Sequence, residues 1–362
     1  MPDFPQRPIA QLLGSNGPVH AVTYSASPSA YVLTGSADRS IRLYNPSSTS
    51  APPTSNSITP PATPAIPKPI PQARLIQSYS AHGYDVLSLS VASSNSTFLS
   101  AGGDRAVFVW DVATAQTIRR LGGIPPHSHT GRINTVTFAG VDDSLALSGG
   151  IDCTVRIWDL RSQGHKPVMV LDGAKDAVTS IVAGRETGGE IIVGSVDGRV
   201  RGYDARMGRC VTDVIGASVT SLCLSRDGKT VLVGGLDSKM RLMDRRDGAC
   251  LRKYEDEGWR NEELRVQSLL GGRERWVVAG DEMAGEGGEG RVWAWGLLTG
   301  KVVAKVSVPW GPAGEGRKRV IGKDGKEKEK KNVVSCIDWK DGGFGDQFCV
   351  GGTSGVATVF GE

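Results

Sequence analysis

The chain has 362 residues, 22% of them charged, and a net charge of +4, which is too small to indicate nucleic-acid or membrane binding. It contains no run of about 20 apolar residues that would span a bilayer, and its N-terminus lacks the segments of a signal peptide. The six cysteines include no CxxC spacing, so we expect free thiols, no metal, no cofactor and a cytoplasmic and nuclear location.

One phrase recurs along the chain, first as LTGSADRSIRLYN at 33–45 and then as LSAGGDRAVFVWD at 99–111. Further copies stand at 147–159, 192–204 and 232–244, and two decayed copies stand at 291–296 and 355–361. Each copy has a small-residue step, usually an aspartate, and an alternating stretch that ends in a large residue. The large residues are Tyr44, Trp110, Trp158, Tyr203, Met243, Trp295 and Phe360. Because a four-stranded blade needs about 40–45 residues, the pattern predicts an all-β, seven-bladed β-propeller of the WD-repeat type over residues 8–362, as one domain.

Alternating segments such as VHAVTYS at 19–25 begin each repeat, and period-2 alternation predicts the innermost strand of each blade. The apolar segment at 8–14 precedes the first repeat and has no blade of its own. We expect it to supply the outermost strand of the last blade, which would close the ring and remove two exposed edges.

Three insertions lengthen the spacing between repeats. Residues 46–73 are so rich in Pro, Ser and Thr that we interpret them as a disordered surface loop. Residues 311–332 form a charged loop insertion, and Lys alternating with Glu at 326–331 favours a solvated loop over a nuclear-import or RNA-contacting patch. Residues 283–290 enlarge a turn in the sixth blade.

Two blades contain the residues of a polar network. In the third blade Asp152 can accept from His129, which can reach Ser148, which can reach the indole of Trp158. The second blade repeats the set as His82, Ser100, Asp104 and Trp110. A Ser-His-Asp triad has the same residue types, but recurrence in a repeat favours a buried structural network. We therefore predict no catalytic residues and no enzymatic activity.

The network is incomplete elsewhere, because Ser15 replaces the histidine in the first blade and Ala174 replaces it in the fourth. An arginine two residues before the large residue recurs in several blades, and we predict that it makes an inter-blade ion pair. These arginines are Arg42, Arg156, Arg201 and Arg241.

Several stretches resemble the mitogen-activated protein kinase organizer family of WD-repeat proteins. They include LLGSNGPVHAVTYS at 12–25, GSVDGRVRGYDARMG at 194–208 and a long run at 219–248. The resemblance covers roughly residues 8–300 and fades in the last two blades. It implies a non-enzymatic scaffold that binds kinase-cascade components and associates with splicing factors in pre-mRNA splicing.

Propellers bind partners mostly on the face formed by the loops that enter the innermost strands. The predicted partner-binding residues are Pro18, His20, Asp85, Leu87, Arg132, Asn134, Thr179, Thr220, Arg265 and Gln267, joined by Ile151 and Leu236 before the turn aspartates. Arginine and apolar anchors suit a protein partner. We expect a monomeric propeller within larger complexes, with no direct contact to nucleic acid or membrane.

An alternative function comes from Trp158, Asp159 and Arg161, which form a WDxR box. The box indicates a substrate receptor of a cullin ubiquitin ligase, with the ligase adaptor as partner. The motif is short and common in propellers.

Overall fold

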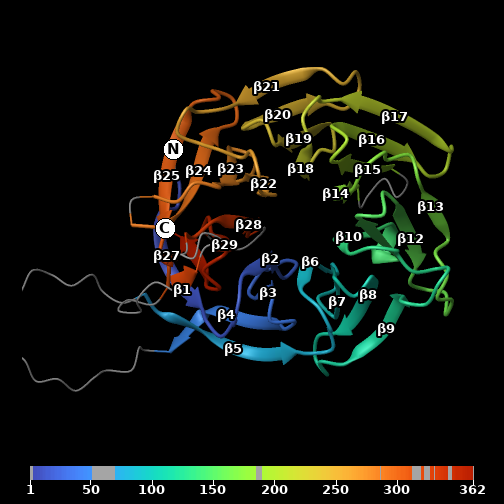
Figure 1. Ribbon diagram of the computed structural model, residues 1–362, viewed down its shortest axis with the longest axis horizontal. Helices are drawn as coiled ribbons and strands as arrows, with labels where there is room; N and C mark the ends of the chain where they lie inside the picture. The colour runs from blue at the N-terminus through green and yellow to red at the C-terminus, as the bar shows by residue number, and fades with distance from the viewer. Residues whose placement is uncertain are drawn as a thin grey trace, which may run out of the picture.

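The computed structural model describes residues 3–50, 70–184, 190–285, 287–311, 319–321, 327–329, 331–340 and 345–361. These residues form a ring of four-stranded sheets around a central channel (Figure 1). Five of the sheets are separate, and an eight-stranded sheet, in the order β2-β3-β4-β5-β1-β30-β29-β28, combines two further groups of four. The described strands thus have the all-β propeller arrangement predicted from the repeats.

Within each blade the strands run outward from the channel in chain order, except that the last blade takes its outermost strand from the start of the chain. The innermost strands are β2 (Val19–Tyr24), β6 (Val86–Val91), β10 (Ile133–Ala139), β14 (Val178–Ala183), β18 (Val219–Leu224), β22 (Ser268–Gly271) and β28 (Val334–Trp339). The second strands are β3 (Val32–Ser36), β7 (Thr97–Gly102), β11 (Leu145–Gly150), β15 (Glu190–Ser195), β19 (Thr230–Gly235), β23 (Trp276–Gly280) and β29 (Phe348–Gly352). The third strands are β4 (Ile41–Ser50), β8 (Ala106–Asp111), β12 (Val155–Asp159), β16 (Arg199–Asp204), β20 (Lys239–Asp244), β24 (Gly290–Gly296) and β30 (Ala357–Gly361). The outermost strands are β5 (Gln72–Tyr79), β9 (Thr117–Gly122), β13 (Met169–Leu171), β17 (Arg209–Val214), β21 (Cys250–Tyr254), β25 (Val302–Val308) and β1 (Arg7–Leu12).

Strand β1 closes the ring. It pairs antiparallel with β30, from Arg7 opposite Gly361 to Leu12 opposite Ala357. A parallel bridge between Gln11 and Gln72 then joins β1 to β5, the outermost strand of the first blade. Around the channel each innermost strand lies beside the next, and β28 returns to β2. The prediction that the segment at 8–14 completes the last blade is confirmed.

The core lies between successive blades. The large residues that end the seven repeat copies are all buried, with Tyr203 the most exposed at 9%. The small-residue step of the repeat allows neighbouring blades to approach closely. A Cβ at Gly149 would lie only 2.5 Å from Cγ1 of Val178 on the next innermost strand. The same contact recurs between Gly35 and Val86 and between Gly194 and Val219.

The Pro/Ser/Thr-rich insertion differs in part from its prediction as a loop. β4 continues to Ser50 and β5 begins at Gln72, and Ser50 and Thr49 pair with Gln72 and Ala73. The two ends of the insertion therefore extend the ladder of the first blade, because each strand offers its backbone groups to the other. Residues 51–69 lie outside the described residues.

The charged insertion contains a short two-stranded sheet, in which β26 (Arg319–Ile321) pairs with β27 (Glu327–Glu329). The described part of the insertion is therefore not a loop throughout. In the turn at 283–290, of which residue 286 is not described, the N–H of Gly285 donates to the carbonyl of Glu289 at 2.8 Å. A 3-10 turn, η1 (Val141–Asp143), is the one helical element of the described chain, which has no helix that could cross a membrane.

Candidate functional site

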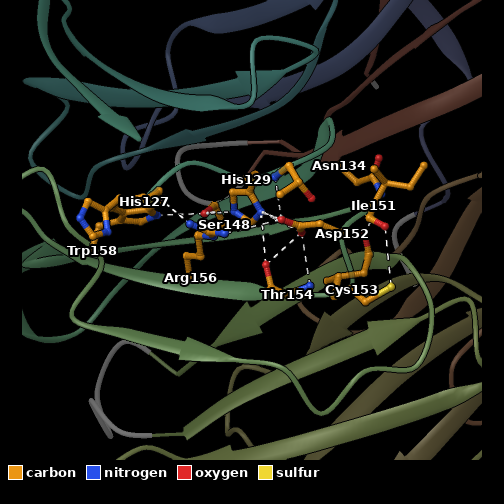
Figure 2. Close-up of polar contacts among 12 residues, drawn as sticks. His127, His129, Asn134, Ser148, Ile151, Asp152, Cys153, Thr154, Arg156 and Trp158 are labelled. Carbon is orange, nitrogen blue, oxygen red and sulfur yellow. Dashed lines mark hydrogen bonds and ion pairs between the residues drawn. The ribbon is translucent and has the colours of Figure 1, made fainter. Parts of the chain in front are cut away.

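The polar network of the β10–β13 blade joins the loop before β10 to strands β11 and β12 (Figure 2). Nδ1 of His129 lies 2.9 and 3.0 Å from the two carboxylate oxygens of Asp152, and Nε2 lies 2.8 Å from Oγ of Ser148. The indole Nε1 of Trp158 donates to the same Oγ at 2.9 Å. The imidazole thus links the turn between β11 and β12 to the interior of the blade.

The β6–β9 blade has the same arrangement. The ring nitrogens of His82 lie 2.6 Å from Oδ2 of Asp104 and 2.7 Å from Oγ of Ser100. Trp110 donates its indole N–H to that Oγ at 2.7 Å. The four side chains form the hydrogen-bonded chain that the sequence predicted for this blade.

The serines of these networks are placed for structure and not for nucleophilic attack. Ser100 and Ser148 are completely buried, and each Oγ is occupied by an imidazole nitrogen and an indole N–H. Burial raises the pKa of Asp152, but hydrogen bonds and the charge interaction with His129, with further hydrogen bonds from Thr130 and Thr154, lower it to about 2. Asp152 is therefore a carboxylate at neutral pH, and no substrate could reach the serine without opening the blade.

The first and fourth blades, which lack the histidine, use arginine instead. In the first blade Arg42 donates to both carboxylate oxygens of Asp38 at 2.7 and 3.2 Å, and to Oγ of Ser36 at 3.3 Å. In the fourth blade Arg201 donates to Asp197 at 2.6 and 3.2 Å and to Ser195 at 2.9 Å. The guanidinium therefore replaces the imidazole as the link between turn aspartate and strand serine.

The prediction of inter-blade ion pairs is wrong for these arginines. All four pair with the aspartate four residues earlier in the same blade. The physical reason is the tight turn between the second and third strands, which directs the arginine back toward its own turn. In the third blade His129 already binds Asp152, so Arg156 is 3.8 Å from that carboxylate and donates to the carbonyl of His127.

The sixth blade has a network that the sequence did not reveal. Asp281 is fully buried, lies 3.0 Å from the guanidinium of Arg291 and accepts the indole N–H of Trp293 at 2.8 Å. Burial raises the pKa of Asp281, although these contacts and two backbone N–H groups oppose the rise. Trp259 takes the place of the histidine and donates to the carbonyl of Gly280. The sequence did contain one signal for this network, because Asp281 follows a small-residue step as the other turn aspartates do. Trp259, however, stands in a segment that lacks the repeat pattern.

The predicted partner face is a rim made of two loops per blade. The residue before the turn aspartate donates its backbone N–H to the backbone carbonyl of the residue before the innermost strand. This bond joins Ile151 to Arg132 at 3.0 Å and Leu236 to Ser218 at 2.9 Å, and it recurs in other blades as Ala37 to Pro18, Gly103 to Asp85 and Val196 to Ala177. The two loop sets that the sequence assigned to one face therefore adjoin each other.

The rim residues differ in accessibility. Asp85, Arg132 and Ile151 are exposed, with Ile151 at 48%, and Tyr84 beside them is 62% exposed. Pro18, His20, Leu87, Leu236, Arg265 and Gln267 are half-buried. At the channel mouth burial lowers the pKa of His20, the charge of Asp85 raises it and the charge of Arg132 lowers it. The exposed rim thus presents both charges and apolar groups.

Asn134, Thr179 and Thr220 are buried and do not form a free surface. Asn134 donates to the carbonyl of Val178 at 2.8 Å, and Thr179 donates to the carbonyl of Val219 at 2.7 Å. Each bond joins one innermost strand to the next. These polar side chains give hydrogen bonds to backbone carbonyls of the neighbouring innermost strand, which explains why they are buried inside the ring.

Arg265 reaches across the channel. Its Nη1 donates to the carbonyl of Asn134 on β10 at 2.8 Å, and its Nε donates to the carbonyl of Thr220 on β18 at 3.3 Å. The preceding loop is held by buried Asn261, whose amide donates to the carbonyl of Gly235 at 3.3 Å. The sequence placed Arg265 on the face, whereas this anchor directs it into the channel.

The WDxR box follows the end of β12 that is opposite to the Asp152 turn. The side chain of Arg161 is 77% exposed, and its Nε lies 3.6 Å from Oδ1 of Asp159. The backbone N–H of Arg161 donates to the same Oδ1 at 2.9 Å. The box therefore presents an exposed arginine, paired with Asp159, on a different edge from the rim. In the described part of the chain no three His, Cys, Asp or Glu side chains gather in a way that could hold a metal ion.

The ring of sheets and the repeated turn networks define a β-propeller built from WD repeats. In agreement, the family described as WD domain, G-beta repeat matches residues 6–45, 73–111, 121–159 and 208–244. WD repeat domain-containing protein 83 of Rattus norvegicus is 35% identical over 307 residues, which cover 85% of this chain and 84% of the relative. The protein of the same name from Homo sapiens is 36% identical with the same coverage. A homolog of it from Dictyostelium discoideum is 28% identical over 321 residues, covering 82% of this chain and 87% of the relative. The chain belongs to the WD repeat domain-containing protein 83 family, which supports a role as a protein-interaction scaffold.

Proposed function

We propose that the chain is a non-enzymatic scaffold that assembles kinase-cascade components and associates with the spliceosome in pre-mRNA splicing. The class of partner comes from the resemblance to the mitogen-activated protein kinase organizer family. The structural observation that supports a scaffold is the rim, where Tyr84, Asp85, Arg132 and Ile151 are exposed on two blades that follow each other. Arginine beside tyrosine and an aliphatic anchor is the composition of interface hot spots. We further propose that the protein works as a monomeric propeller in the cytoplasm and nucleus.

The buried networks support the non-enzymatic part of the proposal. A triad must present its nucleophile to a substrate within hydrogen-bond reach of the base. Ser148 meets the base but has no exposed surface, and its Oγ also accepts the indole of Trp158. The geometry is that of a structural link between two strands and a loop.

The test is affinity purification with quantitative mass spectrometry on rim variants. We expect Ile151→Glu and Arg132→Glu to lose kinase-cascade components and splicing factors, because the rim would lose an apolar anchor and reverse a charge. Val211→Glu is the matched control, because Val211 is 66% exposed on the outermost strand β17. Rim variants that retain all partners, or a wild-type protein that retains neither partner class, would refute the proposal.

The exposure of Arg161 favours a second candidate function, that of a substrate receptor bound to a cullin ligase adaptor. Asp159 holds the turn through the backbone N–H of Arg161 and lies 3.6 Å from its Nε, while the side chain of Arg161 stays 77% exposed. We expect Arg161→Ala to abolish adaptor binding and to leave rim-dependent partners unchanged, since the two surfaces are separate. Absence of adaptor binding by the wild-type protein would remove this candidate.

A further inference from the structure

The channel contains a polar cavity of about 650 Å³, lined by residues of the innermost strands and by Arg265. Side-chain hydroxyls are prominent in its wall. They include Ser88, Ser90, Thr137, Ser180, Ser221 and Ser268. Such a wall offers many hydrogen-bonding groups beside apolar side chains such as Val136, Ile181 and Leu222.

Arg265 supplies a positive charge to this cavity. A guanidinium has five N–H donors, and those of Arg265 have two acceptors, the carbonyls of Asn134 and Thr220. Three N–H donors thus remain without an acceptor among the described residues. Within that part of the chain no carboxylate lies at ion-pair distance from Arg265. Burial and the charge of Arg132 lower the pKa of Arg265 to about 10, which leaves it charged at neutral pH.

Hydroxyl donors accompany the charge. Oγ of Ser180 accepts the N–H of Leu222 at 3.1 Å, and Oγ of Ser90 accepts the N–H of Phe138 at 3.2 Å. Both hydroxyl protons are therefore available to a ligand, since neither has an acceptor among the described residues. Asp338 is the acidic residue of the lining, and its carboxylate accepts the N–H groups of Tyr24 and Trp339.

We propose that the channel cavity binds a small oxyanion of the phosphate type, with Arg265 as its charged donor and a hydroxyl of the lining such as that of Ser180 as a neutral donor. Arg265 is half-buried and keeps three N–H donors without an acceptor in the described chain, so an anion in the cavity can accept them and balance its charge. A guanidinium matches two oxygens of phosphate in a planar, bidentate contact. Because the lining has one arginine, the ligand is a single phosphate group and not a polyphosphate. This site lies in the channel beside the partner rim, since the charge of the rim residue Arg132 acts on Arg265.

The test measures the thermal midpoint of the full chain with inorganic phosphate, with acetate and with chloride at constant ionic strength. We expect phosphate to raise the midpoint of the wild type by about 1–3 °C in a saturable way. Arg265→Met should show no such rise, and Arg161→Met, an exposed arginine on another edge, should respond as the wild type does. A crystal soaked in tungstate should show the anion within hydrogen-bond distance of Arg265.

If Arg265→Met does not fold, Arg265→Lys replaces it. Lysine keeps the charge but loses the bidentate contact, so we expect the apparent dissociation constant for phosphate to rise about tenfold. The proposal is overturned by a wild type that gives no saturable response, or by a response that persists equally in the Arg265 variant, which would mean an adventitious ion only. An equal response to acetate would overturn the phosphate assignment and show a carboxylate site.

Discussion

Replacing His129 with alanine tests the structural interpretation of the polar networks. The side chain is 1% exposed and joins Asp152 to Ser148 through contacts of 2.8–3.0 Å. After truncation Asp152 still accepts from Thr130 and Thr154, and Ser148 still accepts from Trp158. The loss thus combines two buried hydrogen bonds with a cavity of about the size of an imidazole. We expect the free energy of unfolding to fall by about 3 kcal/mol.

Urea unfolding followed by tryptophan fluorescence measures this loss. His165→Ala is the control, because His165 is exposed and a change there should cost less than about 0.5 kcal/mol. A double-mutant cycle with Asp152→Asn should give a coupling energy above about 1 kcal/mol, since the two side chains are in direct contact. A loss below about 1 kcal/mol for His129→Ala would refute the reasoning.

Three further predictions follow from the fold. Arg201→Met breaks a buried pair with Asp197 and should cost about 3 kcal/mol in urea unfolding, whereas Arg161→Met at an exposed position should cost almost nothing; equal losses would contradict the arginine network. The pKa values of Asp38 and Asp152 are about 2, below the ordinary 3.8, so their stabilisation is complete above pH 4 and is lost as the pH falls toward 2; acid unfolding that is unchanged in Asp152→Asn would count against this. Deletion of residues 1–12 leaves the outer edges of β30 and β5 without their partner, so we expect a lower thermal midpoint and self-association in light scattering; a monodisperse protein of unchanged midpoint would exclude a role for β1 in closure.

Much of the architecture could be predicted from the sequence because the repeat encodes it locally. The small residues, the turn aspartate and the large terminal residue each have one position in a blade, so their recurrence identifies the sheets. The histidine networks were also visible, since Ser148, Asp152 and Trp158 occur at the same offsets from one another as their counterparts in the preceding blade, and the histidine precedes the serine by 18 or 19 residues in both. Strand β1 could be assigned because the apolar segment at its position has no blade of its own, and the last blade lacks an outermost strand.

The remaining features depend on directions of side chains that the spacing does not contain. The sequence D-x-x-x-R recurs at Asp38 and Arg42 and at Asp197 and Arg201, but only the turn geometry shows that the guanidinium folds back into its own blade. Likewise, a position in the loop before β22 does not reveal that Arg265 enters the channel. That outcome depends on Asn261, which holds the loop through contacts with another blade.

The pairing of β1 with β30 has a consequence for how the protein is made. β1 leaves the ribosome before every other described strand, and β30, its antiparallel partner, leaves after all of them. The apolar residues of β1 that are buried in the folded ring, among them Ala10 and Leu12, therefore wait without a partner until β30 has been made. The nascent chain offers an unpaired edge throughout that interval, when chaperones could protect it, and the ring of described strands closes only once β30 has left the ribosome.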